Sequence, residues 1–243
     1  MIDSLPKKEL LEAESLSEEK ERAIIIAGAT GLIGTELIKQ MLEADPISHI
    51  YALSRRPVPF FHPKLEVIMD SQLQVKEWQP NSPSPKYGFI CLGTTIKQAG
   101  SKKELERIDY HLVCEVAQTM KSLGVTHIAV ASSYGASPHA LSHYLRCKGK
   151  AEIAIEQMGF EHITFVRPGP LVGLRDTPRN DETVLQLVLK SIRPLMLGKL
   201  AKLIPIQASE VAKAMQYSVF SSAKHKICTL DSIQMRNLIN QYQ

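Results

Sequence analysis

The sequence predicts an α/β fold, a doubly wound parallel sheet with a small C-terminal substrate lobe. Three observations support this prediction. Short apolar segments with β-branched centres recur along the chain, as in parallel strands that are buried on both faces. Segments with helical periodicity separate several of them, an alternation typical of strands joined by right-handed crossovers. A glycine-rich turn joins the first strand to the first helix.

The elements follow one another in a regular order. Residues 1–22 are a polar N-terminal extension with four basic and seven acidic side chains, and the first strand, 23–27, begins where this charge ends. Further strands are expected at 50–53, 65–69, 89–92, 127–131 and 162–166, with helices at 35–43, 103–123 and 145–158. After Pro168 the pattern loosens, so we expect 170–243, with the amphipathic stretch 182–197, to contribute the substrate lobe.

The glycine-rich turn directly follows the first strand and reads Gly28-Ala29-Thr30-Gly31-Leu32-Ile33-Gly34. Glycines at these spacings allow a tight turn, close approach of the backbone to a pyrophosphate, and close packing of helix on strand. The N-terminus of the next helix adds free N–H groups and a partial positive charge. An ordinary βα turn is the alternative, but the strand–turn–helix context favours dinucleotide binding. Residues 23–243 are therefore expected to form a single NAD(P)-binding domain.

The end of the second predicted strand bears on the choice of dinucleotide. A site selective for NAD usually has a carboxylate here, whereas this chain has Ser54, Arg55 and Arg56. Two guanidinium groups and a hydroxyl suit a 2′-phosphate, since Arg makes bidentate phosphate contacts. The alternative is that both arginines are solvated surface residues. We predict NADP(H) in preference to NAD(H).

Three later positions are expected to complete the cofactor site. Asp70 closes the third strand, where its carboxylate can accept a hydrogen bond from the adenine amino group or form a turn. The fourth strand leads into Leu92, Gly93 and Thr94, where the glycine allows close approach to the cofactor. The sixth strand leads into Pro168 and Gly169, a stiff segment expected beside the nicotinamide.

A candidate catalytic group follows the fifth strand. Tyr144 and Lys148 lie four residues apart, on one face of a predicted helix. A phenol near a cation can transfer a proton at neutral pH, and Lys148 is also expected to hold the nicotinamide ribose. Ser133, with Ser132 as the alternative, is expected to polarise a substrate carbonyl. Asp109 precedes this strand, and we expect it to have a surface or capping role rather than to orient a water behind Lys148.

The chain resembles the short-chain dehydrogenase/reductase superfamily, in its extended or atypical branch, in this glycine turn, the two serines, Tyr-x-x-x-Lys and Arg167-Pro168-Gly169-Pro170. The stretches CLGTT, ASSYGAS, YLRCKGKAE and FVRPGPLVG look closer still to its Tat-interacting oxidoreductase-like subgroup. The resemblance covers about Ala23 to Met215. It implies a Rossmann core, an NADP(H) site and a Ser-Tyr-Lys arrangement, and it transfers no substrate.

The function these residues favour is an NADP(H)-dependent oxidoreductase that transfers hydride to or from a small carbonyl or alcohol. One alternative is an NADPH-binding regulatory or scaffold protein without productive catalysis. A weaker one is a nucleotide-sugar epimerase or dehydratase, disfavoured by the short C-terminal part and by Arg55 and Arg56. The segment 174–180, with Arg175 and Arg179, is either a lid over the site or an ordinary surface loop. The helices at 103–123 and 145–158 are candidates for a homodimer contact.

Composition excludes several other classes. A net charge of +4 on 243 residues is too small and too dispersed for a nucleic-acid binder. The four cysteines form no Cys-x-x-Cys pair and the eight histidines no ligand pattern, so no metal is expected. No apolar run reaches the roughly 18 residues of a membrane span. Widely spaced cysteines and an acidic N-terminus predict a cytoplasmic protein.

Overall fold

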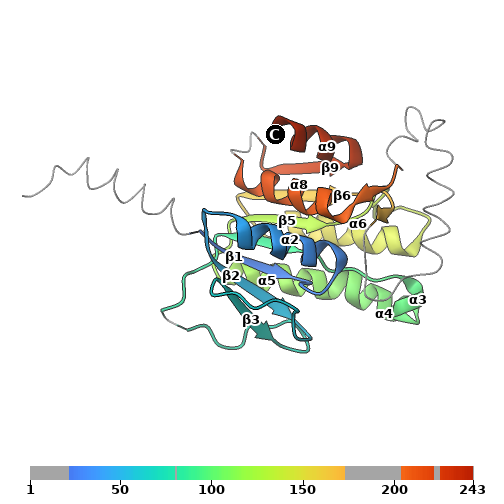
Figure 1. Cartoon of the computed structure of the whole chain (residues 1–243). Helices are drawn as coiled ribbons and strands as arrows, with labels where there is room; N and C mark the ends of the chain where they lie inside the picture. The colour runs from blue at the N-terminus through green and yellow to red at the C-terminus, as the bar shows by residue number, and fades with distance from the viewer. Residues whose placement is uncertain (1–21, 80, 173–203, 222–224, 243) are drawn as a thin grey trace, which may run out of the picture.

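A seven-stranded parallel sheet forms the centre of the molecule (Figure 1). The structure, a computed structural model, describes residues 22–79, 81–172, 204–221 and 225–242. Strand order is β3-β2-β1-β4-β5-β6-β9, so the direction of winding reverses between β1 and β4. The predicted fold class is confirmed. In such a sheet the crevice at the carboxyl ends of the strands, at the point of reversal, is where ligands bind.

The strands of this sheet are β1 (Arg22–Ala27), β2 (Ile47–Ser54), β3 (Leu65–Met69), β4 (Tyr87–Ile90), β5 (His127–Ala131), β6 (His162–Arg167) and β9 (Ile227–Asp231). A separate parallel pair consists of β7 (Leu171–Val172) and β8 (Ile206–Gln207). The helices are α2 (Leu32–Glu43), α3 (Ile96–Ala99), α4 (Lys102–Glu106), the π-helix η1 (Arg107–Leu112), α5 (Val113–Ser122), α6 (His143–Glu156), α8 (Ala208–Phe220) and α9 (Ser232–Gln241). Each of the six predicted strands and three predicted helices overlaps one or more of these elements.

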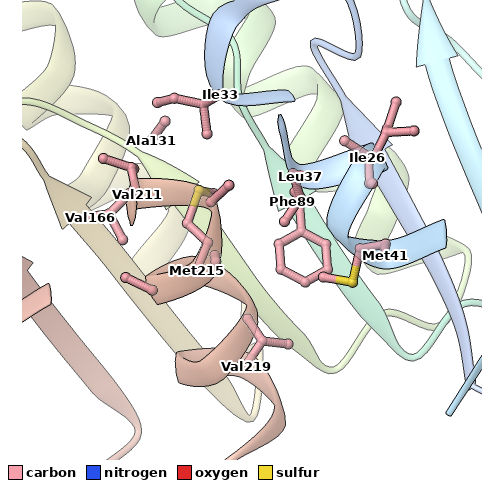
Figure 2. Packing of buried hydrophobic residues seen from close by; sticks show 14 of the residues in the cluster. Ile26, Ile33, Leu37, Met41, Phe89, Ala131, Val166, Val211, Met215 and Val219 are labelled. Carbon is pink, nitrogen blue, oxygen red and sulfur yellow. The ribbon is translucent and has the colours of Figure 1, made fainter. Parts of the chain in front are cut away.

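Alternation along the strands sends side chains into two hydrophobic layers. In β1, Ile24 and Ile26 face the layer beneath α2, α8 and α9, while Ala23, Ile25 and Ala27 face the layer beneath α5 and α6. Figure 2 shows the first layer, where Val211 and Met215 of α8 pack toward the strands. Strands buried on both faces explain the continuous apolar runs in the sequence.

Part of the segment expected to form the substrate lobe belongs to the core instead. Strand β9 pairs with β6 along its length, and α8 lies beside α2 on one face of the sheet (Figure 1). The sequence signal was weak here because β9, Ile227–Asp231, reads Ile-Cys-Thr-Leu-Asp and contains no continuous apolar run. The predicted amphipathic stretch 182–197 lies outside the described residues.

Candidate functional site

The glycine-rich turn is packed against the end of β4. Gly28 has a φ of 86°, and the N–H of Gly31 donates to its carbonyl at 2.9 Å. A Cβ at Gly28 would lie 2.7 Å from the carbonyl oxygen of Cys91. A Cβ at Gly34 would overlap the Gly28 carbonyl oxygen. The turn therefore depends on glycine for both its backbone conformation and its close contacts.

Helix α2 begins at this turn with an open N-terminus. Its N-cap is Gly31, no side chain caps it, and its first turn carries no acidic residue. Its first N–H groups, with the partial positive charge of the helix end, are therefore available to an external anion. The donor set and the cradle without Cβ atoms fit the pyrophosphate of a dinucleotide. Thr35 of α2 also stabilises the turn, because its hydroxyl donates to the Ala29 carbonyl at 3.3 Å.

The Ser54–Arg56 segment lies at the carboxyl end of β2. The Ser54 side chain is buried, and its hydroxyl donates to the Arg56 carbonyl at 2.7 Å and accepts from the Arg56 N–H at 3.3 Å. This hydroxyl therefore shapes the turn. Arg55 and Arg56 are exposed. The pKa of Glu104, in α4, is lowered mainly by its hydrogen bond to Arg107 and to a smaller degree by the charge of Arg55.

Asp70 forms a turn, one of the two roles considered for it. Its Oδ1 accepts from the N–H groups of Gln72 at 2.8 Å and Gln74 at 3.1 Å, and its Oδ2 lies 2.9 Å from Lys76 Nζ. The Lys76 hydrogen bond and these backbone donors lower the pKa of Asp70 to about 2. The turn they stabilise contains Leu73 with a φ of 57°.

Lys148 is buried beneath the loop that follows β4. Its Nζ donates to the carbonyl oxygens of Leu92 at 3.0 Å and Ala131 at 3.1 Å, and lies 3.0 Å from Asp109 Oδ1. The side chain of Lys148 is 4% exposed and that of Asp109 is 0% exposed. Burial alone would lower the pKa of Lys148, but the Asp109 carboxylate, with smaller effects of Tyr144 and Glu152, raises it above its usual value. Lys148 is therefore a fixed cation.

The sequence predicted a surface or capping role for Asp109. The surface position is wrong, because the Asp109 side chain is fully buried. Asp109 lies in the π-helix η1, between α4 and α5. The wider turn changes which side chains face inward, and single π turns are frequent at functional sites. Its Oδ2 also accepts from the Thr94 N–H at 3.1 Å. Asp109 thus joins Lys148 to the Leu92–Thr94 segment expected to approach the cofactor.

Tyr144 and the two serines lie at the same edge of the sheet. Tyr144, in the first turn of α6, is partly exposed and close enough to Lys148 to affect its pKa. Ser132 is buried, its N–H donates to the Val166 carbonyl at 2.8 Å, and its hydroxyl has no hydrogen-bond partner among the described residues. Ser133 is partly exposed. The choice between the two serines stays open.

Hydrogen bonds to other parts of the chain fix the Pro168–Gly169 segment and the residue before it. The Pro168 carbonyl accepts from the Tyr134 N–H at 3.0 Å, and the Gly169 N–H donates to the Ser232 hydroxyl at 3.0 Å. Just before it, Arg167 pairs with Glu152 of α6 through two hydrogen bonds. Sequence reasoning missed Glu152 and Ser232. The four-residue spacing from Lys148 to Glu152 was the available signal for Glu152, whereas no local pattern links Ser232 to β6.

The remaining predictions concern the 174–180 segment, a metal site and a membrane span. Segment 174–180, the predicted lid or loop, lies outside the described residues. Within the described ranges, no group of three or more His, Cys, Asp or Glu side chains is placed to hold a metal ion. In that same part of the chain no helix combines the length and apolarity needed to cross a membrane. A surface cavity of about 410 Å³ involves α2, α8 and α9, and none of its lining residues belongs to the predicted site.

Comparison with known proteins places the chain in an NAD(P)H-binding family. A family described as NAD(P)H-binding matches residues 28–191. The mitochondrial protein FMP52 of Eremothecium gossypii is 30% identical over 224 residues, which are 89% of this chain and 97% of that protein. Protein HTATIP2 of Rattus norvegicus is 29% identical over 180 residues, 72% of this chain and 74% of that protein. The predicted resemblance is confirmed.

Solved structures show the same fold. MoeE5 in complex with UDP-glucuronic acid and NAD has a TM-score of 0.63 at 17% identity, covering 86% of this chain and 75% of its own. The enzyme WbmH of Bordetella bronchiseptica in complex with NAD⁺ has a TM-score of 0.62 at 15% identity, covering 87% and 76%. At such identities the likeness establishes the fold and carries no substrate.

The expected cytoplasmic location is wrong. The FMP52 relatives of Eremothecium gossypii, Saccharomyces cerevisiae and Candida albicans are all named mitochondrial proteins. Scattered free cysteines and an acidic N-terminus predicted the cytoplasm, but neither feature distinguishes one reducing compartment from another.

Proposed function

Because the chain belongs to the NAD(P)H-binding family and is related to the FMP52 and HTATIP2 proteins, we propose that it is an NADP(H)-dependent oxidoreductase acting on a small carbonyl or alcohol. The observation that carries this proposal is the buried Lys148 ammonium placed one helical turn from Tyr144, at the edge of the sheet where the glycine turn lies. A dinucleotide site alone would not require this arrangement.

In the proposed reaction, the residues of the candidate site have separate roles. Gly28, Gly34 and the open N-terminus of α2 would hold the pyrophosphate of NADP(H), which would supply or accept hydride when bound. Tyr144 gives a proton to the substrate oxygen or takes one from it. A free phenol titrates near 10, and a nearby cation favours its anionic form, which is the contribution of Lys148. A hydroxyl of Ser132 or Ser133 polarises the substrate carbonyl.

The Tyr144→Phe variant tests the catalytic role. We expect loss of turnover by at least about 100-fold, because general acid–base catalysis commonly contributes that much, with NADPH affinity within about threefold of wild type. Turnover is measured as NADPH oxidation with a panel of carbonyl compounds, and affinity by fluorescence titration. Tyr217→Phe, on α8, is the matched control. Unchanged turnover in Tyr144→Phe would remove Tyr144 from the mechanism, and NADPH binding without turnover of any carbonyl by wild type would favour a regulatory role.

Arg55 and Arg56 support the preference for NADP(H). Both guanidinium groups are exposed at the end of β2, next to the turn that Ser54 shapes. We expect the Arg55→Ala/Arg56→Ala double variant to bind NADPH at least about tenfold more weakly while NADH affinity changes little, since each charge-assisted contact contributes about 1.5–3 kcal/mol. Lys97→Ala, on α3, is the control. Equal losses for both cofactors would mean that the arginines do not recognise the 2′-phosphate.

The named location of the FMP52 relatives supports a mitochondrial site of action for this chain as well. Fractionation of cells that produce the full chain tests this part of the proposal. Co-sedimentation with mitochondrial markers is expected, and exclusive recovery in the cytosolic fraction would contradict it.

A further inference from the structure

A cavity of about 410 Å³ lies on the face of the molecule formed by α2, α8 and α9, where α8 runs between the other two helices (Figure 1). Polar side chains from all three helices line it, together with Ile239 of the hydrophobic core. Cavities of roughly 300–1,000 Å³ commonly hold small molecules. The lining contains no residue of the glycine turn or of the candidate catalytic group, so a ligand here would be separate from cofactor and substrate.

The side chains that line the cavity carry one net positive charge, from the cations Lys213 and Arg236 and the carboxylate of Glu210. Both oxygens of Glu210 are engaged, because Oε1 lies 3.0 Å from Arg236 Nε and Oε2 accepts from the Gln207 N–H at 2.9 Å. In the described part of the chain Lys213 pairs with no carboxylate, and its ammonium lies 5.9 Å from the centre of the Tyr217 ring. A ligand with a single negative charge would therefore balance Lys213.

Arg236 is fixed in position and keeps donors for a ligand. Its Nε and Nη2 donate to Glu210, and Nη2 also donates to the Pro205 carbonyl at 2.9 Å. Among the described residues, none accepts a hydrogen bond from Nη1. A guanidinium group has five N–H donors, and their planar arrangement suits a carboxylate. Arg236 can thus bind an oxyanion through Nη1 without releasing Glu210.

Gln40 of α2 supplies a buried acceptor at the cavity. Its Nε2 donates to the Ser209 carbonyl at 3.0 Å, which fixes the orientation of the amide. Its Oε1 is buried and accepts from no group within the described ranges. A buried acceptor without a donor is unfavourable, and a hydroxyl group on a ligand would provide that donor. The cavity therefore offers a site for a hydroxyl as well as for a negative charge.

We propose that this cavity is a binding site for a small hydroxylated carboxylate, with the carboxylate held by Lys213 and Arg236 and a hydroxyl bound to Gln40 Oε1. One negative charge matches the one uncompensated cation, whereas a phosphate monoester carries about −1.5 to −2 at neutral pH. The inference goes beyond the proposed oxidoreductase function and does not depend on it, because the two sites share no residue.

The first test compares three six-carbon probes. Gluconate has both the carboxylate and the hydroxyls, hexanoate lacks the hydroxyls, and glucose lacks the charge. Binding to the full-length ¹⁵N-labelled protein is followed by NMR, through the backbone amide signals of Gln40, Ser209 and Asn240 around the cavity, with excess NADPH present. We expect saturable gluconate binding that is at least about tenfold tighter than binding of hexanoate or glucose, because charge-assisted and neutral hydrogen bonds both contribute.

The second test removes the two recognition groups separately. Lys213→Ala should weaken gluconate binding at least about tenfold, and Gln40→Leu should weaken it at least about threefold without weakening hexanoate binding. Lys39→Ala is the matched control, because it removes a lysine next to Gln40 whose ammonium pairs with Glu36 and does not line the cavity. Gluconate affinity in Lys39→Ala should stay within about twofold of wild type, since salt screens exposed charges.

Each other outcome would overturn the proposal. Absence of saturable gluconate binding, or equal affinities for gluconate and hexanoate, would exclude a site for hydroxylated carboxylates. Equal losses in Lys213→Ala and Lys39→Ala would indicate general attraction by surface charge, and tighter binding of inorganic phosphate than of gluconate would contradict the match to a single charge. Circular dichroism checks the fold of each variant, and Lys213→Gln replaces Lys213→Ala if the latter does not fold. If wild type does not bind NADPH, the proposed function is wrong, and the gluconate titrations still decide this site.

Discussion

Gly149 is a residue at which a single added methyl group would disturb the geometry of the candidate site. It lies on α6, one residue after Lys148, with its Cα side against the backbone of Ser137 and Pro138. A Cβ at this position would overlap the carbonyl carbon of Ser137 and lie 2.5 Å from the Pro138 nitrogen. Because backbone atoms cannot rotate away, α6 or the 137–138 segment would have to move.

We therefore expect Gly149→Ala to reduce the free energy of unfolding by about 1–3 kcal/mol, the usual cost of overpacking, although alanine favours helix formation. Turnover should fall as well, since Tyr144 and Lys148 move with α6. Urea denaturation measures the stability. Lys150→Ala, on the exposed side of the same helix, should change it by no more than about 0.5 kcal/mol. A Gly149→Ala protein as stable as wild type would show that the contact relaxes without cost.

For single residues, the sequence predicted which side chains belong to the candidate site better than it predicted which groups they contact. The spacing of Tyr144 and Lys148 placed both on one helix face, as α6 has them. A place for Asp109 near Lys148 was considered but not favoured, because the two residues are 39 positions apart in the sequence and only the fold brings them together. Ser54 and Asp70 show a second limit, since short polar side chains at strand ends bind their own backbone as readily as a ligand.

Among the elements, the strands were the easiest to predict from the sequence, and the helical segment before β5 was the hardest. Apolar periodicity over 103–123 indicated one helix, whereas the chain forms α4, η1 and α5 in succession. Periodicity detects an inward face but not a wider turn within it, because one π turn shifts the pattern by a single residue. That shift places Asp109 inside.

The amino ends of β5 and β6 carry a group that responds to pH. His127 and His162 are cross-strand partners with ring centroids 5.9 Å apart, and the Tyr87 ring lies 5.7 Å from His127 on the other side. Burial, reinforced by His162, lowers the pKa of His127, while Glu161 opposes the shift. The folded protein therefore binds a proton at this site less readily than the unfolded chain does.

A lowered pKa in the folded state means that this contribution to stability is fully present above the unfolded value of about 6.5 and is lost as pH falls below it. We expect His127→Gln to weaken the pH dependence of the unfolding free energy between about pH 6.5 and 5. Urea denaturation across this range measures it, with His111→Gln on η1 as the control. An unaltered pH dependence in His127→Gln would show that His127 does not contribute to acid sensitivity.

For the whole molecule, the sequence predicted the doubly wound sheet but not its seventh strand. Strand β9 reads Ile-Cys-Thr-Leu-Asp and so mixes polar with apolar residues, and Ile227 at its start is 41% exposed. Recognising β9 requires knowing that β6 has a free edge, which is a property of the assembled sheet. The same assembly brings Ser232, at the start of α9, beneath Gly169.

The two hydrophobic layers share one sheet, so we expect them to unfold together. Met215 of α8 is fully buried in the layer shown in Figure 2, and Trp78, the single tryptophan of the chain, packs at the edge of the opposite layer against Tyr51. Met215→Ala should destabilise the fold by about 2–5 kcal/mol through lost burial and the cavity left behind. If the sheet couples both layers, Trp78 fluorescence and far-ultraviolet circular dichroism will report the same shifted urea midpoint. Met69→Ala, whose side chain is 61% exposed, is the control and should leave the midpoint nearly unchanged. Separate transitions from the two probes in Met215→Ala would show instead that α8 and its layer unfold independently of the opposite face.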